Sequence, residues 1–285
     1  MPQRRLGAYV LPGDTVWLEK TLTRTYPLLD ALVVPVPADG VGWNGHPIPV
    51  EAALAIIRRV DTRGILSIVD GRWVEPTEPM RGETAQRQAA IDALAGTVDW
   101  VLQLDGDELL PEPDALFRAI GAAEEQGLRA VEWPMRVLFR RTRRWVFEVV
   151  GRRREPRYDY PGAIVVRPGI ELLDARRVAG DYLRAVVDGD RSSLQIARPA
   201  EAGEYRWEGL RHEEAVIHNS WARSPHEIRQ KVRSWGHAND VGGGRYYWLR
   251  WYPSPVTWRY ARNLHPFARG LWPRLSRTAT TGELD

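Results

Sequence analysis

The chain has 285 residues, a formal net charge of +3, 44% hydrophobic and 27% charged residues, and no cysteine. This composition is ordinary for a soluble globular protein and allows one large domain or two small ones. The lack of cysteine excludes disulfides and thiolate metal sites. No stretch approaches the roughly 18–20 apolar residues of a membrane span, so we expect a cytoplasmic protein.

The first hundred residues alternate between apolar runs and helical patterns. We expect strands at residues 6–11, 31–36, 65–69 and 99–104. Helices are expected from an N-cap at Asp14, at residues 50–60 and at residues 83–94. Strands that alternate with helices are typical of βαβ units. The sequence therefore predicts an α/β fold with a mixed, mostly parallel sheet flanked by helices.

Acidic residues follow several of these strands. Asp39 and Asp70 follow two of them, and Asp105, Asp107 and Glu108 follow the strand that ends at residue 104. Ligands of such sheets bind at the carboxyl ends of the strands. Clustered carboxylates at the end of a buried strand need compensation, which Mg²⁺ or Mn²⁺ commonly supplies. An exposed acidic turn is the alternative.

The helix before this acidic turn directs an arginine toward the core. Arg87 has the same helical phase as the apolar residues of the helix, so it needs an anionic partner. Arg81, Glu83 and Arg87 would gather at the helix start, where the helix dipole also favours anions. This arrangement predicts a diphosphate site beside the acidic turn. A plain Arg–Glu ion pair is the alternative.

The second half has weaker patterns. We expect a helix at residues 113–125, strands at 130–139, 163–167 and 215–218, and a helix that starts at 224–227. Residues 179–204 are polar, without a clear pattern. We assign residues 1–240 to a catalytic domain and 241–285 to a Trp- and Arg-rich extension, whose last dozen residues we expect to be disordered.

Arginine and tryptophan are unusually distributed. Lys20 and Lys231 are the only lysines, and arginines are dense at residues 140–157. That stretch is compatible with an RNA-binding patch, a solvated β-hairpin face, or contact with an anionic or lipid-linked acceptor. The thirteen tryptophans gather toward the C-terminal half, where sugar stacking, lipid contact and core packing are all open.

Two segments together resemble family 2 glycosyltransferases of the GT-A fold. Residues 83–88 (Glu-Thr-Ala-Gln-Arg-Gln) are similar to the helix E-x-x-x-R-N of that family, with Gln88 in place of its Asn. Residues 99–108 are similar to its acidic motif D-W-x-x-x-L-D-x-D-E. The segment from His218 to Lys231, with His237, resembles the C-terminal part of family 2 and family 17 enzymes.

The resemblance implies a GT-A, Rossmann-like fold and transfer of a sugar from a nucleoside diphosphate sugar to an acceptor hydroxyl. It also implies Mn²⁺ or Mg²⁺ on the diphosphate. By position, Asp105 would lie near the donor ribose and the metal, Asp107 would bind the metal, and His218 would add a metal or diphosphate contact. Glu108 we expect to support the turn.

An inverting transfer also needs a carboxylate base on the acceptor hydroxyl. Glu213 and Glu214 precede the strand of His218, and we prefer Glu214. The early part of the chain departs from the family pattern, because residues 12–14 are Pro-Gly-Asp and residues 38–42 are Ala-Asp-Gly-Val-Gly. Asp39 or Asp70 could still bind the base or ribose.

Two other functions remain open. A nucleotidyltransferase uses a similar acidic site, but it usually has a lysine-rich phosphate loop after the first strand, and residues 11–14 lack lysine. A non-enzymatic protein that binds nucleic acid or a membrane surface could be built on residues 140–157. We expect a nucleotide-sugar donor, a glycan or lipid-linked acceptor, contact with the inner face of a membrane, and no nucleic acid.

Overall fold

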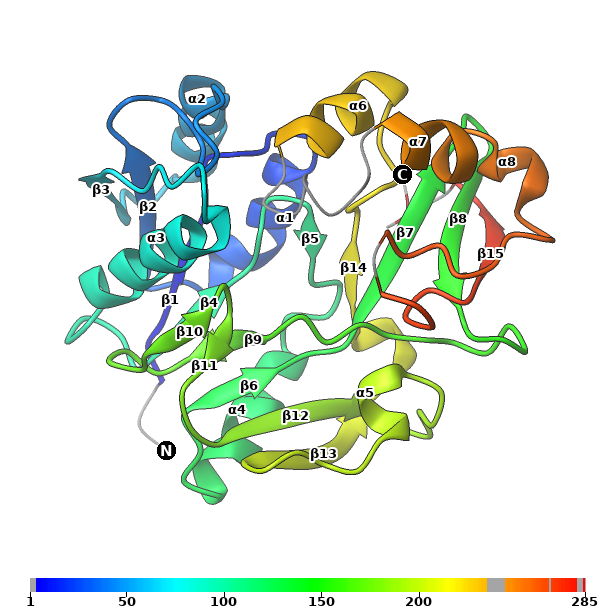
Figure 1. Ribbon diagram of the computed structural model, residues 1–285. Helices are drawn as coiled ribbons and strands as arrows, with labels where there is room; N and C mark the ends of the chain where they lie inside the picture. Colours follow the sequence, from blue (N-terminus) through cyan, green and yellow to red (C-terminus); the bar gives the residue numbers. More distant parts are fainter. Residues whose placement is uncertain (1–3, 235–243, 267, 281–283, 285) are drawn as a thin grey trace.

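The computed structural model describes residues 4–234, 244–266, 268–280 and 284. Within them, an eight-stranded sheet has the order β13-β12-β6-β9-β4-β1-β2-β3 (Figure 1). Its strands are β1 (Leu6–Tyr9), β2 (Ala31–Pro37), β3 (Leu66–Gly71), β4 (Trp100–Gln103), β6 (Ala130–Glu132), β9 (Ala163–Val166), β12 (Tyr182–Val187) and β13 (Glu204–Leu210). Only β9 runs antiparallel to its neighbours. The predicted α/β fold with a mixed, mostly parallel sheet is confirmed.

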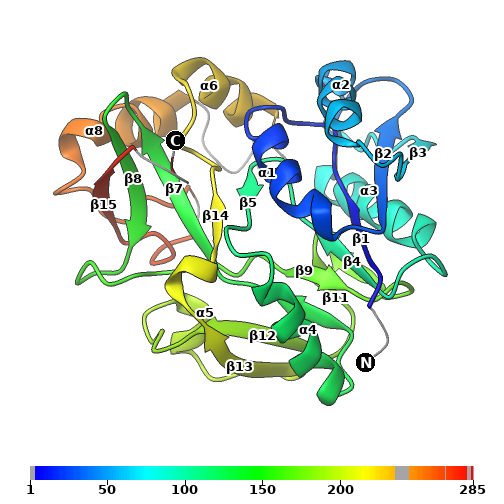
Figure 2. The same ribbon diagram turned by 180° about the vertical axis from the view of Figure 1, so that it is seen from behind.

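Helices cover both faces of this sheet (Figures 1 and 2). Side chains alternate along β1, so Leu6 and Ala8 face one core and Tyr9 faces another. The first core receives α1 (Leu18–Thr25), α2 (Val50–Val60) and α4 (Ala115–Glu125). The second core receives α3 (Pro79–Ala93) and the hairpin of β10 (Leu172–Asp174) and β11 (Arg177–Val178). This alternation directs Tyr9 toward α3.

A second sheet of five described strands has the order β15-β8-β7-β14-β5. Its strands are β5 (Glu108–Leu109), β7 (Met135–Arg141), β8 (Trp145–Val150), β14 (Val216–His218) and β15 (Arg274–Ala279). β5 pairs with β14, and Glu108 lies opposite His218. The acidic turn therefore links β4 of the larger sheet to β5 of the smaller sheet.

Short helices complete the fold. They are η1 (Tyr26–Leu28), α5 (Leu194–Ala197), η2 (His212–Glu214), α6 (Pro225–Ser234), α7 (Gly244–Tyr246), the π-helix η3 (Tyr247–Trp251) and α8 (Ser254–Thr257). The predicted start of α6 is confirmed, because the Glu227 amide donates to Ser224 Oγ and the Ser224 amide donates to Glu227 Oε2. None of the helices that are described combines the length and apolar character needed to cross a membrane.

The C-terminal residues belong to the second sheet. Trp221, Trp251 and Trp272 are buried there, so core packing explains these three tryptophans. β15 pairs along its length with β8. The expected disorder is therefore wrong for residues 274–279. The predicted domain boundary at residue 240 and His237 lie outside the described residues.

Three other predictions need correction. α1 begins at Leu18 rather than after Asp14, and Trp17 occupies its N-cap position. The expected strand 130–139 is divided between two sheets at Pro134, because proline has no N–H for a ladder. Residues 179–204, expected to lack a clear pattern, contain the largely buried strand β12. Its Arg184 is only 3% exposed and pairs with Glu132 and Glu204.

The arginine-dense stretch forms the β7–β8 hairpin rather than one basic patch. Arg140 is buried with its guanidinium 3.8 Å from the ring centre of Trp251. Arg157 is buried and donates to backbone carbonyls of Ser192, Gly270 and Leu271. Arg140 and Arg157 therefore hold the fold together, whereas Arg143, Arg144, Arg152, Arg153 and Arg154 are exposed and leave the nucleic-acid alternative open.

Candidate functional site

The acidic turn lies where the two sheets meet, after the carboxyl end of β4. Glu108 Oε2 accepts the amide N–H of Asp105 at 3.1 Å, and the Glu108 amide donates to the Asp105 carbonyl at 3.0 Å. The expected role of Glu108 in supporting the turn is confirmed. Gly106 allows the turn to approach the segment before α1, because a Cβ at this position would lie 3.3 Å from the carbonyl oxygen of Asp14.

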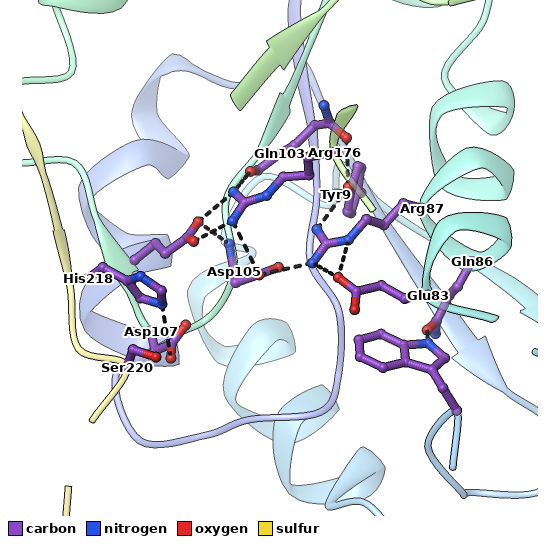
Figure 3. A network of polar contacts seen from close by, with 12 residues as sticks. Tyr9, Glu83, Gln86, Arg87, Gln103, Asp105, Asp107, Arg176, His218 and Ser220 are labelled. Atoms are coloured by element: carbon purple, nitrogen blue, oxygen red, sulfur yellow. Dashed lines mark hydrogen bonds and ion pairs between the residues drawn. The ribbon is translucent and has the colours of Figure 1, made fainter. Parts of the chain in front are cut away.

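Asp105 belongs to a buried network with arginines on two sides (Figure 3). Arg87 Nη2 lies 2.9 Å from Asp105 Oδ2 and 2.8 Å from Glu83 Oε1. Arg87 Nη1 donates to the hydroxyl of Tyr9 at 3.1 Å, and this hydroxyl donates to Gln103 Oε1 at 2.8 Å. Arg87 is only 2% exposed, so the predicted inward arginine and its anionic partner are confirmed.

The second arginine comes from the β10–β11 hairpin. Arg176 forms a two-pronged ion pair with Glu108, with N–O distances of 2.7 and 2.5 Å. Its Nη2 also lies 3.6 Å from Asp105 Oδ2. The other carboxylate oxygen of Asp105, Oδ1, is buried without a hydrogen-bond partner. A buried acceptor without a partner is costly, so Oδ1 needs a hydrogen-bond donor that the described residues do not supply.

Asp107 faces a separate group of cations from the second sheet and α6. Arg223 pairs with both Asp107 and Asp14, which follows β1. Lys231 Nζ lies 3.7 Å from Asp107 Oδ2 and donates to the carbonyl and hydroxyl of Ser220 at 3.0 and 3.1 Å. His218 Nε2 lies 3.8 Å from Asp107 Oδ2. The turn thus brings together groups from three distant parts of the chain.

Burial and neighbouring charges shift the pKa values of Asp107, Lys231 and His218. Burial alone would raise the pKa of Asp107, but Arg223, His218 and Lys231 hold it well below its usual range. Burial, together with the adjacent Arg223, lowers the pKa of Lys231 to about 8. Burial also lowers the pKa of His218. Asp107 is therefore an anion at neutral pH.

The arrangement of the described residues does not fit a metal ion. No group of three or more His, Asp or Glu side chains among them is placed to hold one. The negative charges of Asp105 and Asp107 need compensation. Arg87 and Arg176 supply it for Asp105, and Arg223 and Lys231 supply it for Asp107. In this arrangement Asp105 and Asp107 both face protein cations, and the ligand set of Asp105, Asp107 and His218 stays a prediction.

Three predicted site residues lie away from this cluster. Asp39 is exposed in the turn after β2, and Asp70 is exposed on the edge strand β3. Arg81 is exposed and lies 3.7 Å from Glu78. α3 begins at Pro79, so Arg87 lies in its interior instead of at its N-terminus. The expected helix start at residue 83 is therefore wrong, and the predicted diphosphate site beside Arg87 stays a prediction.

Glu214 does not have the surroundings of a catalytic base. It is 1% exposed, and Arg118 Nη2 lies 3.0 and 2.9 Å from its two oxygens. The backbone amide and guanidinium of Arg211 also donate to it, which fixes the turn at η2. These contacts hold its pKa below the usual value despite burial. The predicted catalytic role is replaced by a structural one, and Glu213 is exposed.

Several members of the cluster carry little signal in the sequence. Arg176 lies in a short hairpin, and Asp14 looks like a helix cap, so neither stands out locally. Lys231 is more visible, because it is one of two lysines and belongs to the C-terminal resemblance. Arg223 directly precedes the capping box of α6, which gives a weaker indication. Only the packing of α6 and β14 beside the acidic turn brings these residues together.

Comparisons with known proteins add little. No family model matches the sequence, and no curated protein matches it. Solved structures with some similarity include 4-diphosphocytidyl-2C-methyl-D-erythritol synthase from Anaerococcus prevotii and mannose-6-phosphate isomerase from Helicobacter pylori. Each is 14% identical with a TM-score of 0.34, over 58% of this chain and 72% of the other. Mannose-1-phosphate geranyltransferase from Thermus thermophilus is 16% identical with a TM-score of 0.29, over 57% and 50%. Similarity this low supports no inference about activity.

Proposed function

We propose that this protein transfers a sugar from a nucleoside diphosphate sugar to an acceptor hydroxyl. The observation that supports this function is the cluster of Asp105, Asp107, Arg223 and Lys231 beside the carboxyl ends of β1 and β4. Ligands of α/β sheets bind at such ends. The resemblance of residues 83–108 and 218–231 to family 2 glycosyltransferases adds the class of reaction.

Each half of the cluster suits one part of such a donor. Lys231 and Arg223 offer positive charge to a diphosphate, which carries its negative charge on oxygens. The unpartnered Asp105 Oδ1 suits a ribose hydroxyl, which can donate a hydrogen bond to it. Arg87 fixes the opposite oxygen of Asp105. The diphosphate of such a donor would therefore contact Lys231 and Arg223, and its ribose would donate a hydrogen bond to Asp105 Oδ1.

In the proposed reaction the acceptor oxygen attacks the anomeric carbon in a single inverting displacement. The bond from that carbon to the diphosphate oxygen breaks, its electron pair leaves with the nucleoside diphosphate, and the acceptor hydroxyl gives its proton to solvent water. Cations lower the barrier by stabilising the departing charge. Asp107 is a weak base, because its pKa is held low. We therefore assign Asp107 to positioning Arg223 and Lys231 rather than to proton removal.

Calorimetric titration with UDP, GDP and dTDP tests the proposal. We expect one nucleotide to bind, and Lys231→Gln to weaken its binding by about tenfold, the worth of one charge-assisted hydrogen bond. Lys20→Gln is the matched control, because Lys20 is the only other lysine and lies on α1 over Trp17. Absence of binding by every nucleotide would contradict the proposal.

The same titration tests whether nucleotide binding depends on the predicted Mn²⁺ or Mg²⁺. It is repeated with Mn²⁺, with Mg²⁺ and with a chelator. Equal affinity in all three would assign charge neutralisation to the arginines and Lys231. Binding that requires Mn²⁺ and is lost in Asp107→Ala would restore the predicted metal site, despite the present arrangement of the cluster.

A nucleotidyltransferase is the alternative function, since a cationic cluster can also bind a triphosphate. The structure places the carboxylate of Asp14 against Arg223, after β1, where such enzymes usually present a lysine-rich phosphate loop. This acidic group opposes binding of additional phosphate charge. Release of pyrophosphate from a nucleoside triphosphate and a sugar phosphate would favour the alternative. Release of a nucleoside diphosphate would favour glycosyl transfer.

A further inference from the structure

The C-terminal part of the chain carries an unbalanced positive charge. Residues 244–280 contain no aspartate or glutamate. They contain seven arginines, namely Arg245, Arg250, Arg259, Arg262, Arg269, Arg274 and Arg277. The whole chain has a net charge of only +3, so this segment concentrates charge that acidic residues balance elsewhere.

The helical arm formed by α7, η3 and α8, residues 244–260, has two different faces. Its inner face buries Tyr246, Tyr247 and Trp251 against the second sheet. Its outer face exposes large apolar side chains at spacings of three or four residues. This outer face consists of Trp248, Leu249, Tyr252, Val256 and Tyr260, which are 58%, 65%, 49%, 85% and 81% exposed.

This exposure is concentrated rather than scattered. Of the eleven large hydrophobic side chains that are exposed in the described chain, five belong to the outer face and lie within thirteen residues. Single exposed hydrophobic residues are normal on a protein surface, but a contiguous group marks a contact with another body. The outer face therefore needs a partner that accepts apolar and aromatic side chains.

Arginines without acidic partners border the outer face. The guanidiniums of Arg154, Arg259 and Arg277 lie 5.0, 5.4 and 5.3 Å from the ring centre of Trp258. No ion pair in the described part of the chain joins any of the three to a carboxylate. Three uncompensated charges around one indole repel one another, so an anionic partner would stabilise this group.

We propose that the outer face binds the surface of a bilayer that contains anionic lipids. Tryptophan and tyrosine prefer the membrane–water interface, where an apolar ring and a polar edge are both satisfied. Leu249 and Val256 enter the acyl region, and the surrounding arginines contact lipid phosphates. The proposal does not depend on the proposed glycosyl transfer, because it concerns a different surface.

Other partners fit this surface less well. Two copies of the arm would bring two sets of uncompensated arginines together, which opposes self-association. Single-stranded nucleic acid binds through aromatic stacking, but Leu249 and Val256 offer no ring to a base. A bilayer accepts aliphatic, aromatic and cationic side chains together.

The arm lies beside the helix that contributes Lys231 to the candidate site. η3 packs beside α6, the helix that carries Lys231 (Figures 1 and 2). An arm that rests on a bilayer would hold α6 and the adjoining cluster near the lipid surface. A lipid-linked acceptor could then reach the site without leaving the membrane.

Cosedimentation of the full chain with vesicles tests the proposal. We expect binding to vesicles of phosphatidylcholine and phosphatidylglycerol, weak binding to phosphatidylcholine alone, and weakening by salt. Leu249→Ser with Tyr260→Ser should reduce the affinity by about tenfold, because both side chains would lose apolar contact. The matched control is Leu173→Ser with Tyr205→Ser, the same residue types exposed at 59% and 45% on other strands.

Several outcomes would overturn the proposal. These are absence of binding to anionic vesicles, unchanged binding by the outer-face variant, and an equal loss in the control variant. Analytical ultracentrifugation distinguishes membrane binding from self-association through the outer face. A dimer that dissociates in the outer-face variant, without vesicle binding by the parent protein, would identify the surface as an interface between copies. Thermal unfolding of both variants checks that these exposed substitutions leave the fold intact.

Discussion

Arg87 on α3 and Asp105 after β4 form an ion pair of 2.9 Å inside the protein, where the side chain of Arg87 is only 2% exposed. The same guanidinium contacts Glu83 and Tyr9. The pair therefore joins a helix to the turn that carries the candidate site. It compensates the charge of Asp105 after a buried strand, and it ties the stability of the fold to the geometry of the site.

We expect Arg87→Met to lower the free energy of unfolding by about 3–5 kcal/mol, because it leaves the carboxylates of Asp105 and Glu83 without their buried cation. Arg81→Met on the same helix is the control. Arg81 is largely exposed, so its substitution should change stability by less than about 0.5 kcal/mol. Urea unfolding measures both. Equal effects would contradict the assigned role of Arg87.

Stability should fall as pH rises through neutrality because of Glu132. Burial raises the pKa of Glu132 to about 7. Arg184 offsets this only in part, because Arg184 also pairs with Glu204, whose negative charge raises the pKa of Glu132. A raised folded-state pKa means that the folded protein holds the proton more tightly than the unfolded chain. This contribution is complete below the unfolded pKa of about 4.3 and is lost as pH approaches and passes 7.

Glu132→Gln should remove this part of the pH dependence, because glutamine does not titrate. Thermal unfolding between acidic and mildly alkaline pH would show a flatter profile for the variant than for the parent protein. Glu204→Gln is a useful comparison, since Arg184, Arg206 and a backbone amide hold the pKa of Glu204 below its usual value despite burial. Identical pH profiles for the parent and Glu132→Gln would disprove the assignment.

We expect Glu214→Gln to destabilise the protein by about 1–3 kcal/mol, since its charged hydrogen bonds with Arg118 and Arg211 would be weakened. Nucleotide affinity should not change, because Glu214 contacts none of the cluster residues in the described chain. A double-mutant cycle with Arg118→Gln would measure the coupling directly. Full stability combined with lost transfer would support the catalytic role that the sequence suggested.

The C-terminal strand should contribute to stability. Leu275 on β15 is 1% exposed and packs in the core of the second sheet. Leu275→Ala should cost about 2–5 kcal/mol, the usual range for a buried leucine. Thr278→Ala on the same strand is the control, because Thr278 is exposed. If both variants unfold like the parent protein, β15 is not part of the cooperative fold.

Local patterns in the sequence determined the α/β class, most elements of the larger sheet, the inward position of Arg87 and the supporting role of Glu108. Each of these depends on hydrophobic periodicity or on a short turn, and both are local properties. The start of α6 was equally readable, because Ser224 and Glu227 form a local capping box.

Tertiary structure alone decided which charges meet. Arg176, Arg223 and Asp14 reach the acidic turn from segments far apart in the chain, and their own neighbourhoods give little or no indication of this contact. It also assigned Glu214 to a structural ion pair, and it placed Asp39 in an exposed turn after β2 and Asp70 on the edge strand β3. An ion pair between distant segments depends on how the sheets pack, and packing is a property of the whole chain.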